Sequence, residues 1–581
     1  MKLVLFDLGN TLESGDVLLP GALETLDAVV AMRDGAAPAA LLGLVSDFTM
    51  ASEPSEIPGI QQQYYVILDL LGIRGFVEPV EERVTLSTEV GVFKPDEAVF
   101  RAAVAKVSPG LTFADTMFIT ENRSHVLAAR HLGLTAVHVR GPGQPTGDVE
   151  KLTDLIPIIR DFAMPAHEAV AVLRVTPDTA ASLADTVAAA GADWTRVGDA
   201  LVVTGSPEAV GRVAEQVADT AALIGRTSAP PGHVQLVLQN GRLFEQEHPD
   251  VPVIAGRGRH LVVALDPAAT QTVHLEHLPC YAVRPLPRNA TVVAERPPVG
   301  ARRARPAWIR ECVDRLSRAT FEADLRALTA FPTRHSTSTH FLTAAHWASD
   351  RLVAMGYTTS TEIVAVGGGT SRNVIAERTG AGKAPRDVVV VTAHLDSVNT
   401  AGGATAPAPG ADDNGSGSAG VLAIAAALAE HPGSLDLRLI LFGGEEQGLF
   451  GSLQYVQRLS DGERGRIRAV VNMDMIGTLN TPTPAVLLEG ATGSQHVIDA
   501  LAEAAEEFTS LVVQTSRTPF NSDHVPFLQA GVPAVLTIEG ADGANANVHS
   551  AADTLDTIDD DLPLEILRMN LGFTAELLGR A

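Results

Sequence analysis

Short apolar runs alternate with helical patterns over residues 1–162. Runs such as "KLVLF" and "ALLGLVS" are separated by segments whose apolar positions recur with helical spacing. Strands that alternate with helices favour a parallel sheet, because parallel strands need a crossover connection that a helix provides. We therefore expect an α/β domain at 1–162.

The same alternation returns over residues 306–581 with longer apolar runs. These runs are "DVVVVTAHLDS", "LRLILFGGEE", "AVVNMDMIG" and "VPAVLTIEG", and helical patterns lie between them. Each run passes from apolar to polar residues near its carboxyl end. The pattern predicts a second α/β domain with a mixed central sheet.

Residues 166–296 show a third pattern. Strand and helix alternate from "AVAVLRV" to "SPEAVGRVAEQVAD", and the segment then becomes β-rich with "VQLVLQNGRLF" and "HLVVALD". Acids, histidines and nucleophiles do not gather in it. We expect a small α+β domain of unknown role, joined to the next domain by the Pro-rich, basic stretch at 296–306.

Composition narrows the class of protein. The chain has 581 residues, more than one core usually supports, and a net charge of −26. Without a broad basic patch, this acidity argues against nucleic-acid and anionic-membrane partners. The two cysteines favour a reducing compartment, and the first apolar run stops at Asp7, too early for a signal peptide. We expect a soluble cytoplasmic protein, with its oligomeric state left open.

Metal-ligand residue types stand at or near the ends of the strands expected in 306–581. Open α/β sheets place their sites at the carboxyl ends of their strands. Two histidines, one glutamate and two aspartates would make two N/O sites with one carboxylate shared, which suits a pair of zinc ions. Eight residues of these types stand at or near the strand ends, and five of them would be the ligands: the eight are His394, Asp396, Asp412, Asp413, Glu445, Glu446, Asp474 and His549.

Two features of this set indicate catalysis. Glu445 and Glu446 are adjacent at the end of an apolar strand, where two carboxylates repel each other and lose hydration. A metal centre explains the pair if one binds a metal and the other takes a proton from the metal-bound water. Asp396 follows His394 by two residues, so in extended backbone it can orient the histidine ring.

The ordered motifs of this segment resemble those of the di-zinc aminopeptidases of the bacterial leucyl-aminopeptidase and aminopeptidase-Y type. They are "AHLDS", "GADDNGSGS", "GGEEQGLFGS", "NMDMIG", "SDHVPF" and "NVHSAADT". The resemblance implies one zinc on His394 and Asp474, a second on Glu446 and His549, Asp412 as the bridge and Glu445 as the general base. It also implies a cis peptide bond between Asp412 and Asp413. Val548 stands where some relatives have a tyrosine near the oxyanion.

The resemblance implies an aminopeptidase that removes N-terminal residues from peptides with a free N-terminus. The alternatives are a related zinc carboxypeptidase or glutaminyl cyclase, and a non-catalytic binding module. A two-metal hydrolase is favoured because the five ligands and Glu445 are all present.

The first segment resembles the haloacid-dehalogenase-like phosphatases, which implies a Rossmann-like domain. The stretch "VLFDLGNTL" matches their nucleophile motif, and three further landmarks follow in order. The implied site comprises Asp7, Ser46, Lys94 and Glu121, with Mg²⁺ as its cofactor. Gly9 stands where the usual general acid would be, so we expect phosphatase activity to be weak or absent. The competing hypothesis is a scaffold or ligand-sensing domain, and real phosphatase turnover would instead make the protein a bifunctional peptidase–phosphatase.

Overall fold

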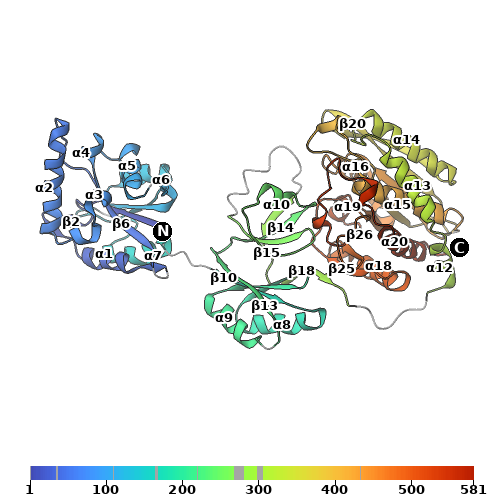
Figure 1. Ribbon diagram of the computed structural model, residues 1–581, viewed down its shortest axis with the longest axis horizontal. Coiled ribbons are helices and arrows are strands. Elements are labelled where there is room, and N and C mark those ends of the chain that lie inside the picture. The colour runs from blue at the N-terminus through green and yellow to red at the C-terminus, as the bar shows by residue number, and fades with distance from the viewer. Residues whose placement is uncertain are drawn as a thin grey trace. The chain divides into compact units, whose positions relative to one another are not determined.

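The computed structural model describes residues 2–34, 37–108, 110–144, 146–163, 168–218, 220–266, 281–297, 305–431 and 433–580. Most of the expected 296–306 linker therefore lies outside the described residues. The chain divides into two compact units, Met1–Ala166 and His167–Ala581, called unit 1 and unit 2 below (Figure 1). Among the described helices, none is long and apolar enough to cross a membrane.

Unit 1 is built on a five-stranded sheet in which every neighbouring pair is parallel, as the alternation of strands and helices predicts. The strand order is β7 (Val84–Leu86), β6 (Ala40–Ser46), β1 (Lys2–Phe6), β8 (Thr116–Thr120) and β9 (Thr135–His138).

Side chains of β1 alternate between the two faces of this sheet. Leu3 and Leu5 belong to an apolar cluster with α5 (Glu97–Val107) and α6 (Arg123–His131). Val4 and Phe6 belong to the opposite cluster, with α1 (Ala22–Ala31), α2 (Ile57–Leu70) and α7 (Leu155–Ala163). The strand is apolar from Leu3 to Phe6 because helices cover both faces.

The carboxyl-terminal part of unit 2 holds the mixed sheet that the sequence predicts. Its order is β25 (Val512–Ser516), β24 (Ala485–Glu489), β26 (Ala534–Glu539), β23 (Ile467–Met473), β21 (Val388–His394), β22 (Asp436–Phe442), β20 (Gly369–Arg378) and β19 (Thr358–Val366). The central strands β22, β21, β23 and β26 are parallel, whereas β20 and β24 pair antiparallel with their inner neighbours.

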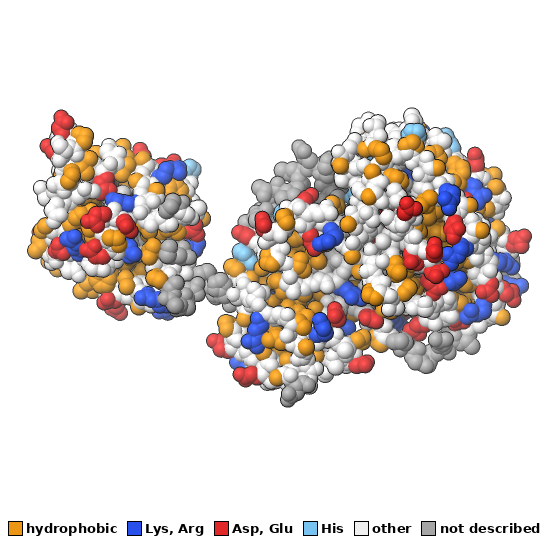
Figure 2. Space-filling model, in the orientation of Figure 1, with side chains coloured by type: hydrophobic (Ala, Val, Ile, Leu, Met, Phe, Trp, Pro, Cys, Tyr) orange, Lys and Arg blue, Asp and Glu red, His pale blue; other side chains and the backbone are white. Residues whose placement is uncertain are grey.

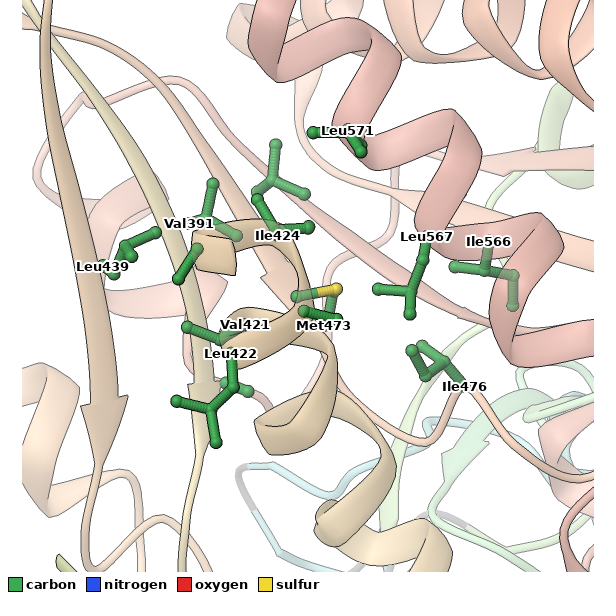
Figure 3. Packing of buried hydrophobic residues seen from close by; sticks show 14 of the residues in the cluster. Val391, Val421, Leu422, Ile424, Leu439, Met473, Ile476, Ile566, Leu567 and Leu571 are labelled. Atoms are coloured by element: carbon green, nitrogen blue, oxygen red, sulfur yellow. The ribbon is translucent and has the colours of Figure 1, made fainter. Parts of the chain in front are cut away.

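Helices α15 (Gly417–Leu428) and α20 (Leu562–Leu578) form the largest apolar core with this sheet. Figure 3 shows Val421 and Ile424 of α15 between Val391 of β21 and Leu567 of α20. The same core includes α12 (Ala307–Val313), α13 (Arg318–Thr329), α14 (Thr339–Ala354) and α18 (Gln495–Phe508), whereas α16 (Phe450–Arg458) and α19 (His524–Gln529) belong to a different cluster.

The middle segment extends the same sheet. Its elements are β10 (Glu168–Arg174), α8 (Pro177–Ala189), β11 (Asp193–Val197), β12 (Ala200–Gly205), α9 (Pro207–Gln216) and β13 (Leu223–Ala229). Strand β18 (Ala290–Glu295) connects the two parts, since it pairs with β11 on one side and with β25 on the other. A second sheet contains β15 (Val253–Arg257), β16 (His260–Ala264), β14 (Val234–Gln239) and β17 (Tyr281–Pro285).

The middle segment also shares a core with 306–581, which the expectation of separate domains did not include. Val172 and Leu236 lie in one apolar cluster with Leu487 of β24 and Ile538 of β26. One face of β24 and β26 is therefore covered by the middle segment, and the two parts form one compact unit. On the face that Figure 2 shows, basic and acidic side chains of unit 2 are interspersed among the described residues.

Candidate metal and catalytic site

Parallel pairing brings the candidate ligands to one edge of the central sheet. His394 ends β21 and pairs with Phe442, which ends β22 three residues before Glu445. Asp474 directly follows β23, the other neighbour of β21. The strand ends thus place side chains from three separate sequence motifs next to one another.

One aspartate, Asp413, lies between two histidines. Its Oδ1 is 3.2 Å from His394 Nε2, and its Oδ2 is 3.2 Å from His549 Nε2. His394 Nε2 also lies 3.2 Å from Asp474 Oδ1, and His549 Nε2 lies 2.9 Å from Glu446 Oε2. Ligand atoms on one tetrahedral zinc are about 3.3 Å apart. The five side chains therefore fit two metal positions that share Asp413.

The structure does not place Asp412, the expected bridge, between the two histidines. Its carboxylate is fully buried beside the site, where it accepts hydrogen bonds from Gly477 N at 2.8 Å and Asn545 Nδ2 at 2.9 Å. The cis peptide bond is also one residue further on, between Asp413 and Asn414. Both aspartates match the motif, but the backbone turn presents only the second to the histidines.

Asp553 is a residue that sequence reasoning missed. It is 2% exposed and accepts hydrogen bonds from Asp412 N at 2.8 Å and Asp413 N at 2.9 Å. It therefore holds the loop that carries the shared aspartate. The only sequence signal was its position four residues after His549 in the motif "NVHSAADT".

Asp396 acts on the glutamate pair rather than on the histidine ring. Its carboxylate accepts hydrogen bonds from Glu445 N at 3.3 Å and Glu446 N at 3.2 Å. The His394 Nδ1 atom lies 3.8 Å from Asp396 Oδ1 but 3.1 Å from the Asp396 carbonyl oxygen. The ring is thus oriented by the backbone of Asp396, while the side chain fixes the two glutamates.

The two glutamates occupy different positions. Glu446 contacts His549, whereas the nearest histidine nitrogen to Glu445 Oε2 is His394 Nε2 at 3.9 Å. Glu445 nevertheless belongs to the same buried group, close to His394 and Asp474. It lies at the edge of the group rather than between its histidines.

The electrostatics of the group favour bound cations. Burial raises the pKa of Glu445 well above its ordinary value and that of Glu446 to about 7. Burial alone would lower the pKa of His394, but Glu445 and Asp474 raise it well above its ordinary value. The hydrogen bonds from His394 and His549 hold the pKa of Asp413 below its usual range despite its burial. Two histidines are thus shared among four carboxylates, those of Asp413, Asp474, Glu445 and Glu446. Divalent metals would offset the negative charge of these carboxylates.

The stretch "SDHVPF" supports this site through its serine. Ser522 Oγ donates to Asp474 Oδ2 at 2.7 Å and accepts from Asn472 Nδ2 at 2.8 Å. Asp523 and His524 are fully buried beside it. Val548 is half-buried and packs with the apolar cluster shared with the middle segment, so its side chain offers no hydrogen-bond donor to a substrate.

A second polar cluster occupies the carboxyl edge of the sheet in unit 1. Lys94 Nζ lies 2.8 Å from Asp7 Oδ1, and both side chains are largely buried. Thr120 Oγ1 is 3.2 Å from Asp7 Oδ2 and 3.2 Å from Glu121 Oε2, so it lies between the two acids. Burial raises the pKa of Asp7, and Lys94 opposes the shift. Ser46 forms its hydrogen bond with Tyr64 OH, at 2.6 Å.

The group of buried histidines and carboxylates at the carboxyl edge of a mixed α/β sheet defines a candidate metal-dependent hydrolase. The model of peptidase family M28 matches residues 373–574. A probable leucine aminopeptidase of Arthroderma benhamiae is 33% identical over 288 residues, which cover 47% of this chain and 77% of that relative. The chain therefore belongs to peptidase family M28.

Other relatives match shorter regions. Aminopeptidase YwaD of Bacillus subtilis is 39% identical over 157 residues, which cover 26% of this chain but only 32% of that protein. Among solved structures, BSAP, a zinc aminopeptidase from Bacillus subtilis, is 30% identical over a region covering 36% of this chain and 50% of that one, with a TM-score of 0.33. Asp413, the four side chains around it and Glu445 all lie inside the family match.

Proposed function

We propose that the chain is a zinc aminopeptidase that removes N-terminal residues from peptides with a free N-terminus. The observation that carries the proposal is Asp413, which lies at the same distance from His394 and His549, each of which contacts one further carboxylate. Family membership supports the reaction class, and the names of the relatives support the preference for N-termini.

Two zinc ions fit the donor set. One would be held by His394, Asp474 and Asp413, and the other by His549, Glu446 and Asp413. When bound, the pair supplies Lewis-acid polarisation of the scissile carbonyl and an activated water for its hydrolysis.

Glu445 is proposed as the general base that takes the proton of the attacking water and passes it to the leaving amine. Its backbone amide is held by Asp396, and its carboxylate lies near His394 without the direct contact that Glu446 makes with His549. This placement supports a role for Glu445 as base rather than as metal ligand.

Paired substitutions test these roles. Glu445→Gln should keep both zinc ions and lower kcat by about 10²- to 10⁴-fold, because it removes a base and leaves the ligands intact. Glu446→Gln should lose zinc as well as activity. Zinc content and hydrolysis of aminoacyl-p-nitroanilides, with and without chelator, measure both effects, and loss of zinc from the Glu445 variant alone would overturn the assignment.

The same assay separates the alternative activities. Release of C-terminal residues would identify a carboxypeptidase, and cyclisation of N-terminal glutamine with a single zinc would identify a glutaminyl cyclase. A protein that binds no zinc would be a binding module. Cytoplasmic location and the absence of nucleic-acid or membrane partners stay predictions.

For unit 1, we infer a haloacid-dehalogenase-like domain whose phosphatase activity is weak or absent. The inference is supported by the ion pair between Asp7 and Lys94 at the carboxyl edge of a parallel sheet. Mg²⁺ would be held there by Asp7 and Glu121. Gly9 offers no carboxyl group to protonate a leaving oxygen, so an ordinary phosphatase cycle lacks its acid.

A further inference from the structure

The middle segment inserts a fully buried arginine beside the candidate metal site. Arg259 occupies the turn between β15 and β16 with Gly258, and its side chain is 2% exposed. A guanidinium that leaves water completely needs hydrogen-bond acceptors and opposite charges around it. The partners of Arg259 therefore show which parts of the protein this turn positions.

Among the described residues, the hydrogen-bond and ion-pair partners of this guanidinium belong to 306–581. Arg259 Nε donates to Asp542 Oδ2 at 2.9 Å, and one terminal nitrogen donates to the Phe520 carbonyl oxygen at 3.3 Å. The same nitrogen lies 3.6 Å from Glu489 Oε1, and that oxygen accepts from Phe520 N at 2.9 Å. Arg259 therefore connects the end of β24 with two loops, those of Phe520 and Asp542.

Both loops carry parts of the candidate metal site. Ser522, two residues after Phe520, donates to Asp474 Oδ2 at 2.7 Å. Asn545 is anchored through its amide to the Asp542 carbonyl oxygen at 3.0 Å, and four residues later the same loop presents His549. Asp474 belongs to one proposed zinc position and His549 to the other.

Close backbone packing holds the turn against one of these loops. A methyl group on Gly543 would lie 2.4 Å from the Gly258 carbonyl oxygen, and a methyl group on Gly241 would lie 3.2 Å from the Asn545 carbonyl oxygen. The middle segment therefore approaches the loop before His549 at two points. The glycines allow this close backbone contact, and Arg259 adds ion pairs with Asp542 and Glu489.

We propose that Arg259 is a positioning residue for the metal centre, which places the loops of Ser522 and His549 so that both zinc positions form. The proposal rests on the proposed zinc peptidase function, and it gives the middle segment a role in the reaction. Residues that orient metal ligands from outside the first coordination sphere typically change metal affinity or activity by about 10- to 100-fold when replaced.

The test compares Arg259→Gln with Arg305→Gln in the full chain. Arg305 is a matched control, because its side chain is 4% exposed and its ion pairs with Glu507 and Glu576 lie on α18 and α20. Metal affinity is measured by titrating metal-free protein with Zn²⁺ and with Co²⁺, whose visible spectrum reports the ligand geometry. The values of kcat and KM on an aminoacyl-p-nitroanilide are measured in parallel.

Arg259→Gln should weaken metal binding by about 10-fold or more, alter the Co²⁺ spectrum and lower kcat with little change in KM. Arg305→Gln should leave affinity and spectrum as in the wild type, even where its melting temperature falls. Unchanged affinity in Arg259→Gln, or an equal loss in both variants, would overturn the proposal.

A second pair of variants covers the case in which Arg259→Gln does not fold. Arg259→Lys keeps the cation between Asp542 and Glu489 but lacks the planar fork that also reaches Phe520. It should show a smaller loss of affinity of about 3- to 10-fold, again absent from Arg305→Lys. If the wild type binds two metals but cleaves no peptide, the proposed function fails, while the titrations still decide the role of Arg259.

Discussion

At the scale of single residues, two adjacent aspartates of one motif have different surroundings. Asp413 faces both histidines, whereas Asp412 accepts hydrogen bonds from Gly477 and Asn545. Asp413→Asn should therefore lose both metals and almost all activity. Asp412→Asn should keep its metals, although its stability should fall by about 1–3 kcal/mol because buried hydrogen-bond partners are disturbed.

Zinc analysis of the two purified variants, together with thermal melts, checks this difference. The pair is well matched because each change removes one charge from neighbouring positions of the same loop. Loss of zinc from Asp412→Asn with retention in Asp413→Asn would restore the role first expected for Asp412.

The sequence could not decide between these aspartates, because the direction of each side chain depends on contacts that are distant in the chain. The turn before them is held by Arg334, which donates to the Gly410 carbonyl oxygen at 2.8 Å and to the Leu395 carbonyl oxygen at 2.8 Å. Asp553 accepts hydrogen bonds from the backbone amides of Asp412 and Asp413. The motif predicted the residue types and their strand ends, while these buried contacts select the carboxylate.

The buried acids also predict how the metal-free protein responds to pH. Burial raises the pKa of Glu446 and of Asp523 to about 7 and that of Asp553 to about 8. An acid whose pKa is higher in the folded than in the unfolded protein stabilises the fold fully only below its unfolded pKa, which is near 4. This stabilisation is lost as the pH rises through the folded pKa, here about 7 to 8. Metal-free protein should therefore become less stable between pH 5 and pH 8, by an amount on the order of several kcal/mol.

Asp413 contributes in the opposite direction, because its lowered pKa stabilises the fold above its unfolded value and only acid removes that contribution. Zinc should reverse the loss at pH 8, since cations favour ionised carboxylates. Urea unfolding of chelator-treated and zinc-loaded protein at both pH values measures the effect. A metal-free protein that is equally stable or more stable at pH 8 would contradict the prediction.

At the scale of elements, the alternation of apolar and polar residues predicted most of the strands that carry the site. It could not predict which strands become neighbours across segments. Strand β18, before the expected linker, pairs with β25 more than two hundred residues later. Such a pairing depends on shape and burial over the whole unit. The local pattern of apolar and polar residues does not contain that information, so it predicts a separate middle domain.

The contact between the β15–β16 turn and the loop of Asp542 gives an element-scale prediction. Gly543→Ala would place a methyl group 2.4 Å from the Gly258 carbonyl oxygen, so one backbone must move. The change should lower the free energy of unfolding by about 1–3 kcal/mol, as overpacking does elsewhere. It should also lower kcat, because the moved loop carries His549.

Gly493→Ala is the matched control. Both glycines are central residues of three-residue 3₁₀ helices, but a methyl group on Gly493 would meet no atom within 4 Å. Its stability should change by about 0.5 kcal/mol or less. Chemical denaturation and peptidase kinetics compare the two, and equal effects would show that the close contact is unimportant.

At the scale of the whole molecule, two units carry clusters at the carboxyl edges of their sheets, and the clusters differ in completeness. In unit 2, each candidate metal position has a histidine, a terminal carboxylate and a shared aspartate. In unit 1, Asp7 is neutralised by Lys94, and Glu121 accepts a hydrogen bond from Thr11 Oγ1 at 2.6 Å. A hard cation such as Mg²⁺ prefers several oxygen ligands, which favours weak binding there.

The last prediction therefore concerns Asp7→Asn in the full chain. Aminopeptidase kcat and KM should stay within about twofold of the wild type, because Asp7 is part of unit 1 and the proposed peptidase residues all belong to unit 2. Neither protein should hydrolyse p-nitrophenyl phosphate or a panel of sugar phosphates strongly with millimolar Mg²⁺, since Gly9 supplies no acid for the leaving oxygen. Clear Mg²⁺-dependent turnover in the wild type that disappears in Asp7→Asn would instead make the protein a bifunctional peptidase–phosphatase. Glu445→Gln is the matched control, because it should remove peptidase activity and leave any such turnover unchanged.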